Sequence, residues 1–215
     1  MDTSTRAAAD TTSRYWDGLY ICKSWYADRL APVRHRLVAL NVPPAVITTA
    51  GIFFGAGAGV ALALLRPGPV AGLAVATLLA ARLACANLDG GVARDGDRAT
   101  PFGSVLNELG DRAAELAALG GCLVFAPTAL VLAAALAATL PSWVALSGAA
   151  AGLGRIQGGP VGKTERCLFL VLMAATGLGV LFLWVIAVGS ALTAVIRLGR
   201  LARRARSVQA TAGAR

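Results

Sequence analysis

The chain has 215 residues, of which 57% are hydrophobic and only 14% charged, whereas soluble domains are about 45–50% apolar and about 25% charged. Its formal net charge of +9 could suit a nucleic acid, but the basic residues flank apolar stretches, as the topology signals of membrane proteins do. The composition therefore predicts an integral membrane protein and argues against a soluble domain or a nucleic-acid-binding protein.

The N-terminal region is polar and lacks the continuous apolar segment of a signal peptide, so we expect the N-terminus to stay in the cytoplasm. Residues 1–13 are rich in Ala, Thr and Asp and are predicted to be disordered. Residues 15–40 mix aromatic and apolar side chains with basic ones, which predicts an amphipathic helix on the cytoplasmic membrane surface. A soluble helix that packs on a partner is the alternative.

Six membrane spans are predicted after this helix. The first, residues 43–65, has no charge and is long enough to cross a hydrocarbon core of about 30 Å. The expected spans are residues 43–65, 70–88, 102–125, 128–153, 163–177 and 180–204. The last two share one apolar run that Gly177-Leu178-Gly179 can divide by a turn, with one long tilted helix as the alternative. The fold class is all-α: a six-transmembrane-helix bundle over residues 14–206 with an N-terminal amphipathic surface helix, then a disordered tail over 207–215.

The distribution of basic residues predicts the orientation. With six spans, the N-terminus, the C-terminus and the polar loops 89–101 and 154–166 lie on one side. The opposite loops hold one basic residue, Arg66, whereas residues 197–206 carry a series of arginines that suits anionic headgroups. The positive-inside rule then places the polar loops in the cytoplasm and makes the chain a multi-pass protein of the plasma membrane.

Acidic and amide side chains inside two adjoining spans predict a site, because each membrane charge costs about 2.5–3.5 kcal/mol on insertion scales. Asn107, Asp111 and Glu115 recur every four residues and share one helix face, and Asp89 ends the preceding span on the same membrane side. Such oxygen ligands suit Mg²⁺ or Mn²⁺, and these cations suit phosphates. The alternative is a salt-bridge network. In it, Arg82, Arg94 and Arg112 would neutralise the acids.

Other ligand types give no pattern. The four cysteines are scattered without a CxxC pair, and the single histidine, His35, lies between two arginines. A zinc site and a disulfide framework are therefore not indicated, and any metal would be held by oxygen.

The polar segment resembles the signature of the CDP-alcohol phosphotransferase family, DxxDGxxAR…GxxxDxxxD. Asp89-Gly90-Gly91-Val92-Ala93-Arg94 is followed by eight residues and then by Gly103, Asn107 and Asp111 at the family's spacing. Residues 41–48 are similar to the start of the family's first span, and residues 159–166 resemble its phosphate-binding loop. The resemblance covers roughly residues 16–204 and implies six membrane helices with a cytoplasmic site.

The chain departs from the signature at two acidic positions. Ala86 and Asn107 stand where the family has aspartates. The segment 106–111 together with the loop 159–166 is similar to a less characterised bacterial branch that carries asparagine here. Because Asp89 and Asp111 are the acids of the motif that remain, we expect one bound cation, with two as the alternative. Glu108 could supply a missing ligand only if the helix rotates or unwinds.

The resemblance implies transfer of a phosphatidyl or other substituted phosphoryl group from a CDP-alcohol, with CDP-diacylglycerol the expected donor, to an acceptor hydroxyl in phospholipid biosynthesis, releasing CMP. Asp89 and Asp111 would hold Mg²⁺ or Mn²⁺ with Asn107 as a neutral ligand, and Asp111 would be the general base. The substrate-binding residues that it implies are Gly90, Ala93, Arg94, Gly103, Arg155, Lys163 and Arg166.

Two other functions stay open. Ala86 and Asn107 favour a non-catalytic relative that binds nucleotide or lipid. A small transporter would also place charges in its spans, although the sequence shows no inverted repeat. The expected partners are the donor lipid, the alcohol acceptor and the bilayer, with no nucleic acid. The acceptor alcohol and a homodimeric state are left undecided by the sequence.

Overall fold

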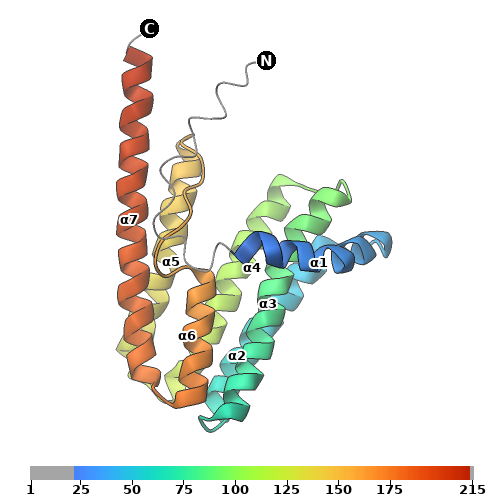
Figure 1. Cartoon of the computed structure of the whole chain (residues 1–215), viewed down its shortest axis with the longest axis vertical. Coiled ribbons are helices and arrows are strands. Elements are labelled where there is room, and N and C mark those ends of the chain that lie inside the picture. Colours follow the sequence, from blue (N-terminus) through green and yellow to red (C-terminus); the bar gives the residue numbers. More distant parts are fainter. Residues whose placement is uncertain (1–21, 214–215) are drawn as a thin grey trace.

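The protein is described by a computed structural model that covers residues 22–213, and every element assigned within that range is helical. The elements are α1 (Cys22–Ala39), α2 (Pro44–Leu64), α3 (Pro69–Asp95), α4 (Pro101–Gly120), the 3-10 helix η4 (Gly121–Val124), α5 (Thr128–Ala150), α6 (Lys163–Thr176) and α7 (Gly179–Gly213). Helices α2 to α7 run side by side as an elongated bundle, and α1 lies across it (Figure 1).

Short punctuation signals set the ends of the helices. Proline lies in the first turn of α2, α3 and α4, where a missing N–H costs nothing. Thr100 caps α4 by accepting a hydrogen bond from the backbone N–H of Gly103 at 2.9 Å. Gly177 ends α6 in the left-handed conformation with φ 76°. The apolar run from Cys167 therefore forms two helices and not one.

Helices α2 and α4 touch backbone to backbone. A Cβ atom added to Gly59 would lie 2.3 Å from the carbonyl oxygen of Ala117, and one added to Gly55 would lie 2.5 Å from that of Ala114. Gly121 in turn faces the carbonyl of Gly59. Small residues at such crossings are typical of membrane helices, which associate through close contact. The contact fixes the position of α4, and hence of its polar face, against α2.

The remaining helices complete the bundle around one apolar core. Helix α2 packs along α3 and α4, α5 packs along α7, and α6 contacts both α3 and α7. Core side chains such as Val75, Leu119 and Leu183 are fully buried between them. Helix α6 thus links the two groups of helices. Its upper end lies at the level where α1 crosses the bundle (Figure 1).

Two helices extend beyond their expected ends. Helix α3 continues to Asp95, so the expected loop 89–101 is wrong over residues 89–95. Leu88 and Val92 explain the extension, because both are buried against apolar residues of α1 and the α1–α2 turn. Helix α7 is also helical over 207–213, where we expected a disordered tail, and the preceding residues 200–206, which are rich in Ala and Arg, favour this continuation. The N-terminal tail that we expected to be disordered, and the start of the expected amphipathic helix, fall outside the described residues.

Four of the described helices are long and apolar enough to cross a membrane: α2, α3, α5 and α7. Helix α4 is as long as α2 but carries a polar face, and α6 has only 14 residues, or about 21 Å at 1.5 Å per residue. Length and composition therefore support four spans directly, and α4 and α6 complete the bundle between them.

Candidate functional site

Three helices bring polar groups to Asp89, whose side chain is almost fully buried on α3. Thr48 of α2 donates its hydroxyl to Oδ2 at 2.9 Å, and Asn107 of α4 donates its amide to Oδ1 at 3.1 Å. The backbone N–H of Gly90 also donates to Oδ1, at 2.6 Å. All of these donors are uncharged, so among the described residues the negative charge of Asp89 has hydrogen-bond partners but no counter-ion in direct contact.

Asp111 lies on α4, one helical turn after Asn107, and contacts two positively charged side chains. Lys163 Nζ, at the first residue of α6, is 2.5 Å from Asp111 Oδ1. Arg82 Nη2, from α3, is 3.9 Å from the same oxygen and donates to the backbone carbonyl of Asp111 at 2.9 Å. Helices α3, α4 and α6 therefore meet at this carboxylate.

A small cavity connects the two carboxylates. Asp89 and Asp111 both line it, together with Arg82 and the methyl group of Ala86. Ala86 is one of the two positions at which the family signature has an aspartate. The second such residue, Asn107, bonds to Asp89 directly. Both departures from the signature thus face the same site.

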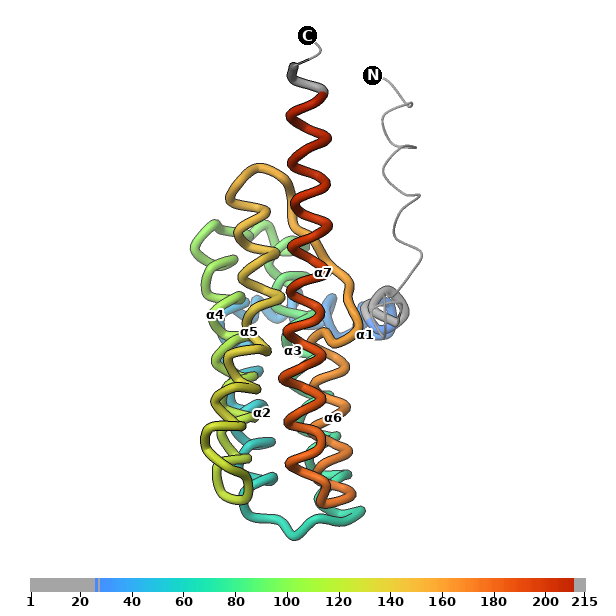
Figure 2. The backbone as a smooth tube through the Cα atoms, turned by 90° about the vertical axis from the view of Figure 1, so that its left-hand side faces the viewer, coloured from blue at the N-terminus to red at the C-terminus, as the bar shows by residue number. Residues whose placement is uncertain are grey.

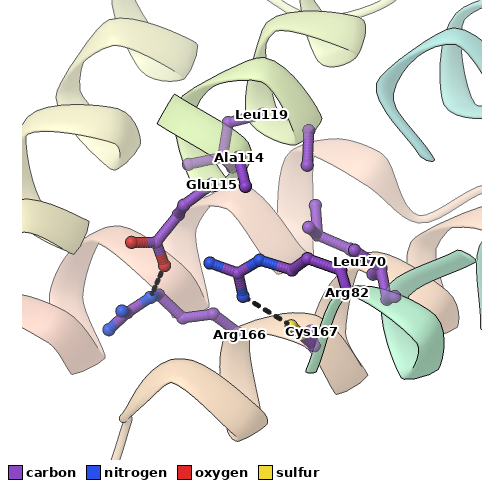
Figure 3. A pocket seen from close by; sticks show the side chains of 9 residues that line it. Arg82, Ala114, Glu115, Leu119, Arg166, Cys167 and Leu170 are labelled. Carbon is purple, nitrogen blue, oxygen red and sulfur yellow. Dashed lines mark hydrogen bonds and ion pairs between the residues drawn. The ribbon is translucent and has the colours of Figure 1, made fainter. Parts of the chain in front are cut away.

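A buried ion-pair network continues from this site along α4 into the interior of the helix bundle. Glu115 Oε1 accepts from Arg166 Nε and Oε2 from Arg112 Nη1, each at 2.5 Å. Arg82 donates to the sulfur of Cys167 beside Glu115 and Arg166. These four residues line a second small pocket (Figure 3). Glu115 and Arg166 are 6% and 4% exposed. This side of the polar stripe fits the salt-bridge network that the sequence left open.

Glu108 belongs to a third set of contacts at the rim. Its Oε2 is 2.5 Å from Arg155 Nη2, and its Oε1 is 3.9 Å from Arg112 Nε. Arg155 is half exposed in the loop between α5 and α6. Glu108 therefore has cationic partners of its own and does not replace the missing carboxylates.

Of the residues expected to bind substrate, some lie at the site and others lie away from it. Gly90 faces the site, because a Cβ atom there would lie 3.3 Å from Arg94 Nη1 and 3.7 Å from Asn107 Nδ2. Gly103 is exposed at the start of α4, and Arg166 is buried on Glu115. Ala93 is half-buried on α3, between the buried Val92 and the exposed Arg94.

Sequence reasoning missed Thr48 and assigned Lys163 no protein partner. A hydroxyl one turn into an apolar helix is a weak signal for Thr48, because threonine commonly bonds its own helix, as Thr48 also does to Pro44 at 3.3 Å. The pairing of Lys163 with Asp111 depends on how α6 docks on α4, and no local pattern encodes this.

The donor chemistry of the site fits one hard cation. Within residues 22–213, no three His, Cys, Asp or Glu side chains gather closely enough to hold a metal. The available oxygens are the carboxylates of Asp89 and Asp111, with the Thr48 hydroxyl and the Asn107 amide beside them, and such oxygens suit Mg²⁺ or Mn²⁺. The Lys163 ammonium contacts the Asp111 oxygen to which a metal cation would bind.

Comparison with known proteins rests on structure. No family model matches the chain, and no curated protein matches it by sequence. Three crystal structures of phosphatidylinositol phosphate synthase from Mycobacterium tuberculosis are similar to it. The chain shares their fold.

The structure with manganese and citrate has a TM-score of 0.64 and 24% identity over 79% of this chain and 87% of the synthase chain. The structure with CDP-DAG has a TM-score of 0.64 and 23% identity over 79% and 92% of the two chains. The apo structure has a TM-score of 0.61 and 23% identity over 79% and 94%. Most of the synthase chain and 79% of this chain are therefore covered by the shared fold.

Proposed function

We propose that this protein is a membrane-bound CDP-alcohol phosphotransferase, which transfers a phosphatidyl or related group from CDP-diacylglycerol to an acceptor hydroxyl and releases CMP. The observation that carries the proposal is the meeting of Asp89 of α3 and Asp111 of α4 at one small cavity, with Lys163 of α6 in an ion pair with Asp111. The related synthase binds CDP-DAG and manganese in its crystal structures, which supports both the donor and the cation.

Asp89 and Asp111 would hold one Mg²⁺ or Mn²⁺, with Asn107 as a neutral oxygen ligand once its amide turns. When bound, the cation would offset charge on the pyrophosphate of the donor. Three hydrogen bonds fix the Asp89 carboxylate for this role. Asn107 presents its amide nitrogen, and not its oxygen, to Asp89. Its oxygen would therefore be a weaker cation ligand than the carboxylates of Asp89 and Asp111.

In the proposed reaction, the acceptor oxygen replaces CMP on the phosphorus and loses its proton to a side chain. The acceptor oxygen attacks the phosphorus that carries the lipid, the bond from phosphorus to the CMP oxygen breaks, and Asp111 takes the hydroxyl proton. Lys163 and Arg155 offset charge on phosphate oxygens from the side of the α5–α6 loop. Gly90, Ala93 and Gly103 would leave room for the nucleotide, which Arg94 would brace.

Arg166 is assigned a positioning role in place of direct substrate contact. Its guanidinium lies against Glu115 and its Nη1 donates to the carbonyl of Val161 at 3.4 Å. It thus ties the start of α6 to α4. The ammonium of Lys163, three residues earlier on α6, is held in place by this attachment.

The proposed membrane arrangement has six spans, α2 to α7, with α1 as an amphipathic helix on the cytoplasmic surface. Helix α1 crosses the bundle at the level of the first residues of α6 (Figure 1). A membrane boundary at that level leaves the upper ends of α3, α4, α5 and α7 on the cytoplasmic side. The site would then open at the headgroup level of the plasma membrane.

The decisive experiment measures CMP release by the purified protein from CDP-diacylglycerol over a panel that includes glycerol 3-phosphate, an inositol phosphate and serine. We expect release that depends on one acceptor and on Mg²⁺ or Mn²⁺, and loss of release in Asp111→Asn, because this variant lacks both a ligand and the base.

Other outcomes identify the alternatives. Binding of CDP-diacylglycerol without CMP release for any acceptor indicates a non-catalytic relative. Full activity of Asp111→Asn contradicts the assignment of the base.

A further inference from the structure

Asp111 Oδ1 already contacts positively charged side chains of the protein itself. Lys163 Nζ is 2.5 Å from Oδ1, and Arg82 Nη2 is 3.9 Å from the same atom. At Asp89 the situation differs, because the donors that contact this carboxylate from the part of the chain that the structure describes are all uncharged. The two proposed ligands are thus unequal: one is bound to an internal cation and the other is not.

We propose that Lys163 competes with the divalent cation for Asp111, so that cation binding releases the Lys163 ammonium from the carboxylate and makes it available to the phosphates of the substrate. This inference rests on the proposed function, because it requires a cation at Asp89 and Asp111. It adds a role for Lys163 as an internal counter-ion that closes the cation-free site.

Lys163, and not Arg82, is the cation that can leave. The Lys163 side chain is 25% exposed at the first residue of α6, next to the irregular loop 151–162, and its ammonium sits on a flexible stem. Arg82 is 2% exposed and is tied to the carbonyl of Asp111 and the sulfur of Cys167. Exchange at Asp111 therefore needs a movement of one side chain only.

The missing carboxylates make this competition significant. Ala86 and Asn107 remove two negative charges of the family signature from the site. Two carboxylates remain, Asp89 and Asp111, and both nearby cations, Lys163 and Arg82, contact Asp111, so the charges of these four groups sum to zero without a metal. An external cation therefore reaches Asp111 only by replacing Lys163, and its affinity should be low.

The first test measures Mn²⁺ affinity directly, by electron paramagnetic resonance of free Mn²⁺ in titrations of detergent-purified protein without substrate. Lys163→Met keeps the length of the side chain and removes its charge, so we expect the dissociation constant to fall at least about tenfold. Lys163→Arg keeps the charge and should stay within about threefold of the unaltered protein. The matched control is Arg98→Met, which removes an equal charge from the α3–α4 loop, where Arg98 donates to the Asn41 carbonyl. It should change the constant by less than about twofold.

The second test uses the unaltered chain. Its only lysines are Lys23 and Lys163, so reductive methylation followed by peptide mass spectrometry compares the two within one molecule. Saturating Mg²⁺ should increase the methylation rate of Lys163 several-fold, because an amine released from an ion pair is more reactive, and should leave the rate of Lys23 unchanged.

Contrary results are distinct for the two proposals. Equal or weaker Mn²⁺ binding in Lys163→Met, or methylation of Lys163 that Mg²⁺ does not change, overturns the competition, while CMP release by the unaltered protein would leave the proposed function standing. Absence of Mn²⁺ binding in every variant overturns the competition and the cation site together.

Discussion

Asn107 is the residue whose chemistry most directly limits the proposed cation site, because it donates a hydrogen bond where the family signature supplies a carboxylate. We predict that Asn107→Asp tightens Mg²⁺ binding by about tenfold, since a third carboxylate would then face the cavity. The half-saturating Mg²⁺ concentration for CMP release measures this. Gln157→Glu is the control, as it adds the same charge in the exposed α5–α6 loop. An equal shift in both variants would mean that Asn107 acts only through general charge.

Glu115 should matter for stability more than for chemistry. Its two oxygens pair with Arg112 and Arg166 in the protein interior. Removing one partner of a buried network leaves uncompensated charge and typically costs about 3–5 kcal/mol. We therefore expect Glu115→Gln to lower the melting temperature of the detergent-solubilised protein by several degrees. Asp97→Asn removes a charge from an exposed loop position with φ 51°, which asparagine tolerates, and should leave the melting temperature unchanged. Equal melting temperatures for the two variants would argue against a structural network.

At the scale of elements, the contact between α2 and α4 gives a sharp comparison of two glycines on one helix. A methyl group on Gly59 would lie 2.3 Å from the Ala117 carbonyl oxygen, whereas one on Gly57 would lie 3.4 Å from the flexible end of Leu78. Gly59→Ala should therefore force the helices apart and reduce the monodisperse fraction in size-exclusion chromatography, and Gly57→Ala should not. If both variants behave like the unaltered protein, the helices are not in backbone contact at Gly59.

The sequence predicted the helical elements well and their contacts poorly. The helices, the turn at Gly177 and the four-residue stripe on α4 follow from apolar length, glycine chemistry and helical period, which are local properties. The extension of α3 to Asp95 was missed, because it depends on α1 covering Val92. The pairing of Lys163 with Asp111 was missed for the same reason, since it arises only when α6 docks beside α4.

For the whole molecule, the proposed orientation predicts which labels are accessible from each side of the membrane. In a variant whose four native cysteines are replaced by alanine, cysteines at Arg155 and at the C-terminus should react with a membrane-impermeant maleimide only from the cytoplasm. A cysteine at Gly68 should react only from outside. Reaction of the labels at Gly68 and Arg155 from the same side contradicts the six-span arrangement.

Helix α7 is long enough to project beyond the rest of the bundle. Its 35 residues correspond to about 52 Å at 1.5 Å per residue, against a hydrocarbon core of about 30 Å, and its end stands clear of the other helices (Figure 2). Arg197 clamps the helix to the carbonyls of Gly158 and Pro141 at 2.8 Å each. Through Gly158, Arg197 joins α7 to the same loop that leads into Lys163. The projecting end of α7 and the candidate site are thus linked through one arginine and one loop.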